Sequence, residues 1–480
     1  MSVGYEMVAG LEVHVELATE SKIFCGCTTK FGGEPNTHIC PVCTGMPGTL
    51  PVLNRQVLEF AIRTGVTLSC DITRVNKFDR KNYCYPDLPK AYQISQLYLP
   101  ICRNGSLEVE ADGGTKTIRI HEIHMEEDAG KLVHDHLDNY TSVDYNRCGV
   151  PLLEIVSEPD FRSAGEIISY LEKLREILIY LGVSDCKMQE GSMRADVNLS
   201  VREPGGEMGT RTEMKNMNSI KAIHRAVLYE TARQIELLES GGSVVQETRR
   251  WDDDKGESFS MRTKENAQEY RYFPEPDLLP MEISEAWIES VAANIPELPE
   301  QKRARYRKDM GLSEPDAEVL TSARELAQLF EETTALCNEP REAANLIIVE
   351  IMRLCTDSAT PAESIKIDAK KLAALIGLVV SGKINRTVSK QVLERIFYDD
   401  ADPLTFVREQ GLLMLDDPEL LARTVSDVLS ENSRSIEDYK SGKEKAFGYL
   451  MGQIMRALKN KADPKAVSAE LRAQLESALY

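Results

Sequence analysis

The sequence predicts an α+β protein: an N-terminal domain with a polar-faced, largely antiparallel sheet and flanking helices, followed by all-α helical and tail domains. Within the first 280 residues, several segments alternate apolar and polar residues with the period of two typical of a strand. After the Pro-rich break at 296–299, apolar residues instead recur at helical spacing. A chain of 480 residues is too long for one core. We therefore predict domains at 1–294, 295–405 and 406–480.

Composition and charge limit the classes of protein that the sequence fits. Hydrophobic residues make up 42% and charged residues 28%, as in ordinary globular proteins. No segment predicts a membrane span or a signal peptide, so we expect a cytoplasmic protein with its 11 cysteines reduced or bound to metal. The net charge of −20 argues against nucleic-acid binding over the whole surface. Residues 431–480 carry a net charge of +2, which leaves room for a local RNA contact.

The first predicted strand, at 10–17, places two carboxylates and an imidazole on one face. Its polar residues Glu12, His14 and Glu16 alternate with leucines and valines. Oxygen ligands together with one imidazole suit a divalent cation. The alternative is a solvated strand face with an incidental histidine, because exposed Glu and His are common.

Two closely spaced cysteine pairs follow in a segment rich in glycine and proline. The pairs are Cys25 with Cys27 and Cys40 with Cys43. Four thiolates at this spacing predict a tetrahedral zinc site that is structural, because four protein ligands leave no open position. The alternatives are four unrelated buried cysteines, or a site in which His38 replaces one thiolate.

The segment 77–93 is dense in cations and aromatic rings, and its prolines predict a loop. The cations are Lys77, Arg80, Lys81 and Lys90, and the rings are Tyr83, Tyr85 and Tyr92. Such a loop could hold phosphates and stack a base. An ordinary surface loop is the alternative.

Two further strands carry carboxylates. The alternation at 117–127 ends in Glu126 and Glu127, which would point to opposite faces, so only one of them can join a given metal. Glu154 lies in an otherwise apolar run, where an unpaired carboxylate would be costly. A metal or cation partner is therefore implied, and a salt bridge at a strand end is the alternative.

A fourth amphipathic strand, at 193–202, follows a strong helix at 166–181. Its polar face carries Arg194, and Lys215 and Asn216 come soon after it. A sheet with so polar a face suggests a ligand made of metal and phosphates, and hence kinase-like work on an anion. No phosphate-binding Gly-rich loop of the G-x4-G-K-[ST] type occurs, and the helices expected after residue 295 show no catalytic constellation.

Long motifs, in order along the chain, resemble one family: the B subunit of the tRNA-dependent Asp/Glu amidotransferase. The resemblance covers essentially the whole chain. The motifs are GLEVHVE (10–16), KFDRKNY (77–83), HMEEDAGK (124–131), GVPLLEIVSEPD (149–160), YRYFPEPD (270–277) and AFGYLMG (446–452).

The resemblance implies a cradle domain that uses ATP and Mg2+ to phosphorylate the side-chain carboxylate of misacylated Glu-tRNA(Gln), Asp-tRNA(Asn) or both. Ammonia released in a glutaminase A subunit would travel through a tunnel and displace the phosphate. A small C subunit would complete a heterotrimer, and the tail would contact the tRNA. A non-catalytic RNA-binding adaptor and a stand-alone metal-dependent hydrolase are the rival functions.

The resemblance also implies roles for individual residues. Glu12, His14, Glu127 and Glu154 match the family's magnesium cluster. Cations must also neutralise the charge that gathers on the γ-phosphate during transfer, and from this chemistry we predict Lys81, Arg194 and Lys215 for that role. Lys77, Tyr83, Lys90 and Asn216 would line the ATP pocket. Only part of the family has the four-cysteine site, so zinc is expected to support structure rather than mechanism.

Overall fold

The computed structural model describes residues 4–134, 140–263, 270–414, 417–458 and 461–477. Internal contacts divide the chain into two compact units, Met1–Pro299 and Glu300–Tyr480. This division falls close to the predicted boundary at 294/295. Among the described residues, no helix combines the length and apolar character that crossing a membrane requires.

The first unit is built on a nine-stranded sheet in the order β14-β13-β12-β11-β1-β10-β7-β6-β2. Among these described strands only β12 and β13 pair in parallel, so the predicted largely antiparallel sheet is confirmed. The strands are β1 (Glu6–Glu16), β2 (Asp71–Ile72), β6 (Cys102–Ala111), β7 (Gly114–Glu127), β10 (Pro151–Ser157), β11 (Met193–Arg202), β12 (Thr212–Lys215), β13 (Glu247–Asp252) and β14 (Glu257–Thr263).

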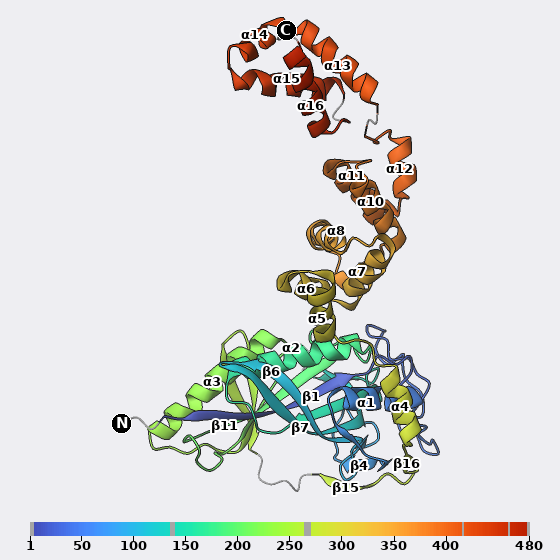
Figure 1. The fold of residues 1–480 in the computed structure, drawn as a ribbon. Helices are drawn as coiled ribbons and strands as arrows, with labels where there is room; N and C mark the ends of the chain where they lie inside the picture. Colours follow the sequence, from blue (N-terminus) through green and yellow to red (C-terminus); the bar gives the residue numbers. More distant parts are fainter. Residues whose placement is uncertain (1–3, 135–139, 264–269, 415–416, 459–460, 478–480) are drawn as a thin grey trace. The chain divides into compact units, whose positions relative to one another are not determined.

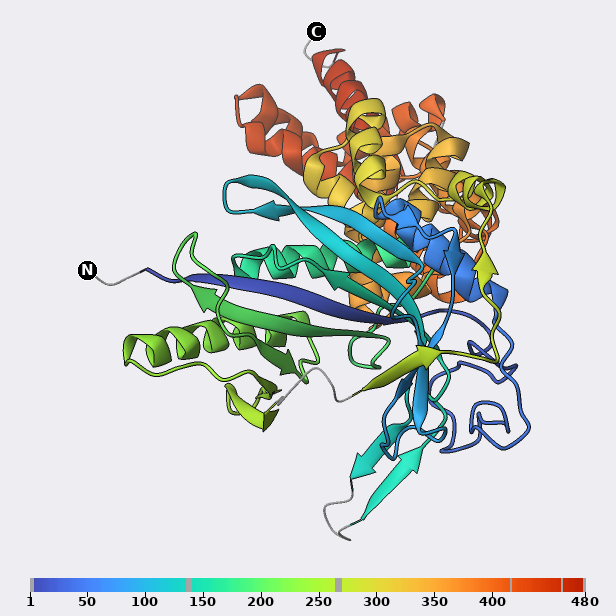
Figure 2. The same ribbon diagram turned by 90° about the horizontal axis from the view of Figure 1, so that it is seen from below.

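Three small sheets complete the described strands of this unit. They are β15 (Arg271–Pro274), β4 (Asp79–Asn82) and β5 (Tyr92–Ser95); β16 (Met281–Glu282) with β3 (Val75–Asn76); and the hairpin β8 (Lys131–His134) with β9 (Thr141–Asp144). The segment 77–93, predicted as a loop, thus contains residues of two paired strands, and only the stretch between them is irregular. Figure 2 shows the β8–β9 hairpin projecting from the body of the unit.

Helices cover one face of the large sheet because only that face is apolar. Leu11, Val13 and Val15 point from β1 into a core shared with the helices. Figure 1 shows α2 and α3 running along the same side of the sheet. The helices are α1 (Arg55–Thr67), α2 (Ala164–Tyr180), α3 (Ile220–Glu239) and α4 (Glu285–Ala293). The alternate side chains of β1, Glu12 and His14 among them, therefore lie on the opposite, polar face.

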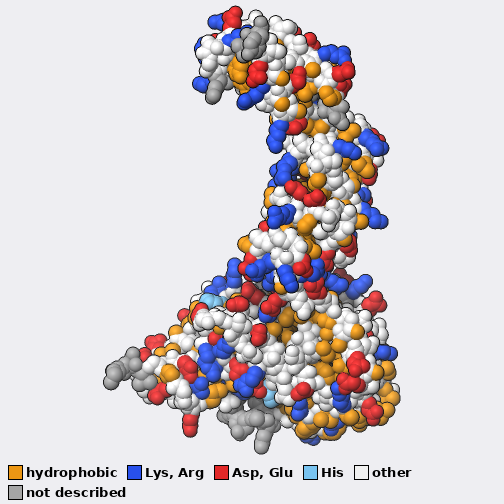
Figure 3. Space-filling model, viewed as in Figure 1, with side chains coloured by type: hydrophobic (Ala, Val, Ile, Leu, Met, Phe, Trp, Pro, Cys, Tyr) orange, Lys and Arg blue, Asp and Glu red, His pale blue; other side chains and the backbone are white. Residues whose placement is uncertain are grey.

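Described residues of the second unit form helices only, as predicted. One apolar cluster extends from Tyr306 to Val407 and another from Val425 to Leu475. In the view of Figure 3, both signs of charge are interspersed over this unit. The helices are α5 (Pro299–Met310), α6 (Glu314–Thr321), α7 (Arg324–Cys337), α8 (Pro340–Asn345), the π-helix η1 (Leu346–Ile351), α9 (Met352–Asp357), the short 3-10 helix η2 (Ala362–Ser364), α10 (Ala369–Val380), α11 (Arg386–Asp399), α12 (Pro403–Glu409), α13 (Pro418–Glu431), α14 (Ser433–Lys440), α15 (Glu444–Ala457) and α16 (Pro464–Ser477).

Candidate active site

A row of charged and imidazole side chains crosses the centre of the polar sheet face. His14 on β1 lies opposite Arg194 on β11 and opposite Glu154 on β10. Glu154 in turn lies opposite His124 on β7. Directly paired residues of neighbouring strands project to the same face, so the register alone gathers these four side chains.

Two carboxylates and a histidine of this region form what we call the imidazole–carboxylate group: His14, Glu126 and Glu154. One ligand atom from each lies within 4.8 Å of the others. His14 Nε2 is 3.4 Å from Glu154 Oε2 and 3.8 Å from Glu126 Oε1. His124 Nε2 is 2.9 Å from the same Glu154 oxygen. One nitrogen and two carboxylate ligands fit a divalent cation such as Mg2+ or Mn2+.

Burial and neighbouring charges both shift the pKa values of this group. Burial alone would lower the pKa of His14, but the charges of Glu154 and Glu126 raise it to about 9. Burial raises the pKa of Glu126, and the neighbouring Glu154 adds to this effect. The pKa of Glu154 lies well below its usual range, against the effect of burial, because two histidines face it. A bound cation would therefore displace a proton from the imidazole.

The structure places Glu127 outside the imidazole–carboxylate group, contrary to the predicted ligand set. Its carboxylate oxygens lie 2.5 and 2.7 Å from Lys90 Nζ, and it accepts a hydrogen bond of 2.9 Å from the Ile94 N–H. The pairing of His124 with Glu154 fixes residue 126 on the polar face and residue 127 on the other. Glu126 thus takes the predicted place of Glu127. Lys90, predicted to contact ATP, forms this ion pair with Glu127, and its contact with ATP stays a prediction.

Glu12 lies in a second acidic group and not in the group that contains His14. Carboxylate oxygens of Glu12, Asp196 and Glu213 lie within 4.8 Å of one another. Lys215 Nζ forms an ion pair with Asp196 and another, of 3.0 Å, with Glu213. Asn198 Nδ2 donates a 2.8 Å hydrogen bond to Glu12. Lys215 therefore lies on the polar face, as a charge-neutralising residue would.

The other two predicted catalytic cations also border the imidazole–carboxylate group. The charges of Glu126 and Glu154 raise the pKa of Lys81 on β4, although burial would lower it. The Lys81 ammonium lies 5.0 Å from the centre of the Tyr270 ring. Arg194 forms a 2.9 Å ion pair with Asp128, and the charge of Glu126 also acts on it. The structure thus brings Lys81 and Arg194 to the same side of the sheet.

Among the described residues, those predicted to line the ATP pocket have different neighbours. Tyr83 stacks edge-on against Tyr270, with ring centres 5.2 Å apart, and so lies beside Lys81. Lys77 contacts Asp79 at 3.8 Å and lies 5.5 Å from the centre of the Tyr98 ring. Asn216 has a left-handed backbone with φ of 68° and donates to the Trp251 carbonyl at 3.1 Å. Of these predicted residues, Tyr83 is the one that contacts the side chains flanking Lys81.

A crevice on the polar face was missed by sequence reasoning. It encloses about 320 Å³ between β1, β10 and β11, beside the second acidic group. Pairing of β10 shifts register between Val156 and Ser157, and the Ser157 hydroxyl accepts the Leu11 N–H at 2.8 Å. The Ser-Glu-Pro sequence after residue 156 was a signal for this strand end. Residues lining the crevice include Leu11, Val156, Ser157, Pro159, Asn198 and Arg211.

The four cysteines converge as the spacing predicts. Their sulfurs lie within 4.8 Å of one another. Cys43 Sγ accepts a hydrogen bond of 3.2 Å from the Cys40 N–H, and the Lys22 ammonium lies 3.7 Å from it. A hydrogen bond from Cys25, with these donors, lowers the pKa of Cys43 to about 5. Four sulfur donors, one of them readily ionised, fit Zn2+.

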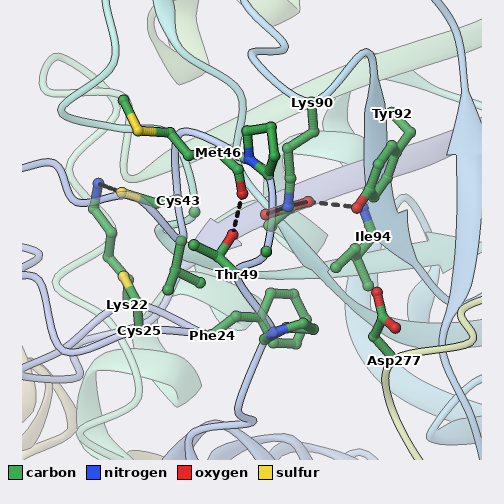
Figure 4. Close-up of a pocket in the computed structure, with 17 residues that line it drawn as sticks. Lys22, Phe24, Cys25, Cys43, Met46, Thr49, Lys90, Tyr92, Ile94 and Asp277 are labelled. Carbon is green, nitrogen blue, oxygen red and sulfur yellow. Dashed lines mark hydrogen bonds and ion pairs between the residues drawn. The ribbon is translucent and has the colours of Figure 1, made fainter.

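This cysteine cluster borders a cavity of about 190 Å³ (Figure 4). Lys90 and Tyr92 lie on one side of it, and Cys25, Cys43 and Lys22 on the other. The imidazole of His38 packs against Gly33. His38 is not part of the cluster, so a site made of the four cysteines fits the geometry better than one in which His38 replaces a thiolate.

The fold and the site together define a class of protein: a domain built on a large sheet that gathers carboxylate, imidazole and cationic side chains on one face, followed by a helical unit. Comparison with known proteins identifies the family. The chain belongs to the GatB/GatE family, since residues 7–289 match the GatB/GatE catalytic domain and residues 328–475 match the GatB domain. The resemblance stated from the motifs is confirmed.

Several relatives match this chain over nearly its whole length. The chain is 62% identical over 475 residues to the B subunit of the aspartyl/glutamyl-tRNA(Asn/Gln) amidotransferase from Lachnoclostridium phytofermentans, covering 99% of both chains. Proteins with the same name from Agathobacter rectalis and Caldicellulosiruptor bescii are 58% and 56% identical. These matches cover 97% and 98% of this chain and 98% and 99% of the relatives.

Proposed function

We propose that this chain is the B subunit of an aspartyl/glutamyl-tRNA(Asn/Gln) amidotransferase, a carbon–nitrogen ligase, and that its first unit activates the side-chain carboxylate of a misacylated tRNA. The observation that carries this proposal is the imidazole–carboxylate group with Lys81 and Arg194 beside it. Relatives at 56–62% identity bear the same name over nearly their whole length.

The chemistry requires activation because a carboxylate is a poor electrophile. The carboxylate oxygen attacks the γ-phosphorus of ATP, the bond to the β-phosphate oxygen breaks, and ADP leaves. Ammonia then attacks the carbonyl carbon of the acyl phosphate, loses a proton, and expels inorganic phosphate. The product is the side-chain amide, so glutamate becomes glutamine, or aspartate becomes asparagine, while still attached to its tRNA.

Residues on the polar face supply the charge that this transfer needs. His14, Glu126 and Glu154 would hold Mg2+, which supplies positive charge beside the transferred phosphoryl group. Lys81 and Arg194 add fixed positive charge from the side, and Lys215 adds it beside the second acidic group. The crevice lined by Val8, Val156 and Pro159 is apolar enough for the base of the nucleotide and lies next to Glu12.

The remaining parts have supporting roles in this proposal. A glutaminase A subunit supplies ammonia and a C subunit completes the heterotrimer. The helices from α13 onward contact the tRNA, and the four cysteines hold a structural Zn2+. Among the described residues we identify no group of side chains suited to hydrolysing glutamine, which fits a division of labour between subunits.

The decisive experiment measures phosphate release from radiolabelled ATP by the purified chain together with its A and C subunits. Misacylated Glu-tRNA(Gln) and Asp-tRNA(Asn) are supplied separately, and correctly charged Glu-tRNA(Glu) is the control. We expect phosphate release with Mg2+ and a misacylated tRNA, and amide formation when glutamine is added. Phosphate release that does not depend on the tRNA would favour a stand-alone hydrolase. Binding of tRNA without phosphate release would favour an RNA-binding adaptor.

A further inference from the structure

Lys22 is buried completely, which is rare for a lysine without an acidic partner. Its exposed fraction is 0%. A buried ammonium is costly unless an anion compensates it. In the described part of the chain, no Asp or Glu forms an ion pair with Lys22. Its ammonium instead donates to the His38 carbonyl at 2.8 Å and to Cys43 Sγ at 3.7 Å. The acidic group that it contacts is therefore a thiol of the cysteine cluster.

The local backbone directs Lys22 toward this thiol. The Lys22 N–H donates to the Cys27 carbonyl, and the next residue pairs with the Gly149 carbonyl. The lysine stem passes close to Gly149, where a Cβ would lie at an ordinary van der Waals distance of 3.6 Å from Lys22 Cδ. Figure 4 shows the ammonium aimed at Cys43. The contact is thus built by the fold and is not a chance rotamer at the surface.

We propose that Lys22 is a resident counter-ion of the four-cysteine centre and raises its affinity for zinc. Four thiolates around Zn2+ carry a net charge of −2, which is unfavourable at a site that is partly shielded from water. The Lys22 ammonium reduces that charge to −1 and does so through one ligand, Cys43. Lys22 contacts no metal itself, so it is a positioning residue that acts on a ligand. This inference rests on the proposed zinc site and not on the proposed amidotransferase reaction.

The test compares zinc affinities of full-length variants by competition with a chromophoric chelator. Lys22→Met keeps most of the stem and removes the charge. Because loss of a partner behind a metal ligand typically costs about 10- to 100-fold in metal affinity, we expect a loss in that range. Lys30→Met is the matched control, since it removes the same charge from an exposed position in the same segment. Its zinc affinity should stay at the wild-type value.

A second background separates charge compensation from simple packing. In Cys43→His, the ligand is neutral and the sulfur that Lys22 touches is gone. Adding Lys22→Met to this background should change zinc affinity by less than about twofold, because the coupled partner is absent. An equal loss of zinc affinity in both backgrounds would overturn the proposal, because Lys22 would then act only through its hydrogen bond to the His38 carbonyl.

Two further readouts keep the proposal falsifiable. The absorption of the Co2+-substituted protein reports whether all four sulfurs still bind in Lys22→Met, as we expect. If Lys22→Met does not fold, Lys22→Arg is measured in its place. This variant keeps the charge, so it should retain the zinc affinity of the wild type. A loss of more than about tenfold would overturn the proposal. A wild-type chain without stoichiometric zinc would refute the zinc site as well, and would leave the amidotransferase proposal standing.

Discussion

Glu126 and Glu127 are adjacent in the sequence, yet they face opposite sides of β7 and have different partners. Glu126 lies with His14 on the polar face, at 3.8 Å. Glu127 lies against Lys90 on the other face. Replacing either residue removes one negative charge from the same strand. The pair therefore provides its own control for assigning the metal ligand.

Glu126→Gln should raise the Mg2+ concentration needed for tRNA-dependent phosphate release by about tenfold or more, since even indirect partners of a metal ligand contribute that much. Glu127→Gln leaves the Lys90 ammonium without its anion, so it should lower the melting temperature and leave the Mg2+ requirement unchanged. A Mg2+ titration of phosphate release, with Glu108→Gln on the exposed side of β6 as control, measures both. If Glu127→Gln raised the required Mg2+ concentration more than Glu126→Gln did, Glu127 would be the metal ligand.

The sequence could predict most of the candidate site but not this choice. Strand alternation showed that only one of Glu126 and Glu127 can join a given metal. Which one does so depends on how β7 pairs with β10, and a period of two contains no information about pairing partners. The same reason explains Glu12: alternation put it on the face of His14, but the β1–β11 register placed it opposite Asp196. Lys90 forms an ion pair with Glu127, which the loop prediction did not foresee, and its contact with ATP stays a prediction.

Among the elements, helix α3 is tied to the neighbouring strands through one buried carboxylate. Glu230 has an exposed fraction of 0%. It accepts hydrogen bonds from Thr212 on β12 at 3.0 Å and from Ser258 on β14 at 3.3 Å. Arg233 binds both of its oxygens at 2.7 and 2.8 Å. Glu230 therefore holds together the edge of the sheet that carries Lys215.

Glu230→Gln should destabilise the chain by roughly 3 kcal/mol, as expected when one member of a buried ion pair is removed. Burial alone would raise the pKa of Glu230, but the hydrogen bonds from Arg233 and its neighbours hold it below 4.5. The carboxylate thus contributes full stability above pH 4.5, and that contribution is lost as the pH falls through the lowered pKa.

Urea unfolding at pH 7 and at a series of pH values below 4.5 measures both effects. The variant should be less stable at pH 7, and its stability should fall less steeply in acid than that of the wild type. Ser260→Ala, at an exposed position of β14, is the control. If the free energy of unfolding fell equally steeply with pH in wild type and variant, Glu230 would not be the source of the acid sensitivity.

At the scale of the whole molecule, the change from strands to helices was the most predictable feature. Alternation ends and helical spacing begins near the Pro-rich break, and contacts divide the chain at Pro299. The finer boundary at 405/406 stays a prediction: the first helical cluster extends to Val407, and Phe406 and Leu412 pack against it. Such short helices merge into a preceding core through tertiary contacts that composition does not reveal.

Because the cluster from Val425 to Leu475 contains its own buried residues, it can be removed without opening the cluster before it. A chain that ends at Met414 should bind misacylated tRNA about tenfold more weakly. The tRNA would keep its contact with the active site but lose its second contact, with the helices from α13 onward. At saturating tRNA it should release phosphate at the rate of the full-length chain. Filter binding and phosphate assays on the assembled complex test this. Unaltered tRNA affinity would refute a tRNA-binding role for these helices.

The row from Arg194 through His14 and Glu154 to His124 lies on strands that are paired on both sides. His14 and Glu154, at the centre of the row, are paired with residues of both neighbouring strands, so insertions or loop exchanges cannot shift them without breaking the sheet. The chemistry is thereby insulated from drift in the surrounding loops. Loops at the rim of the polar face can therefore change while these four side chains keep their spacing.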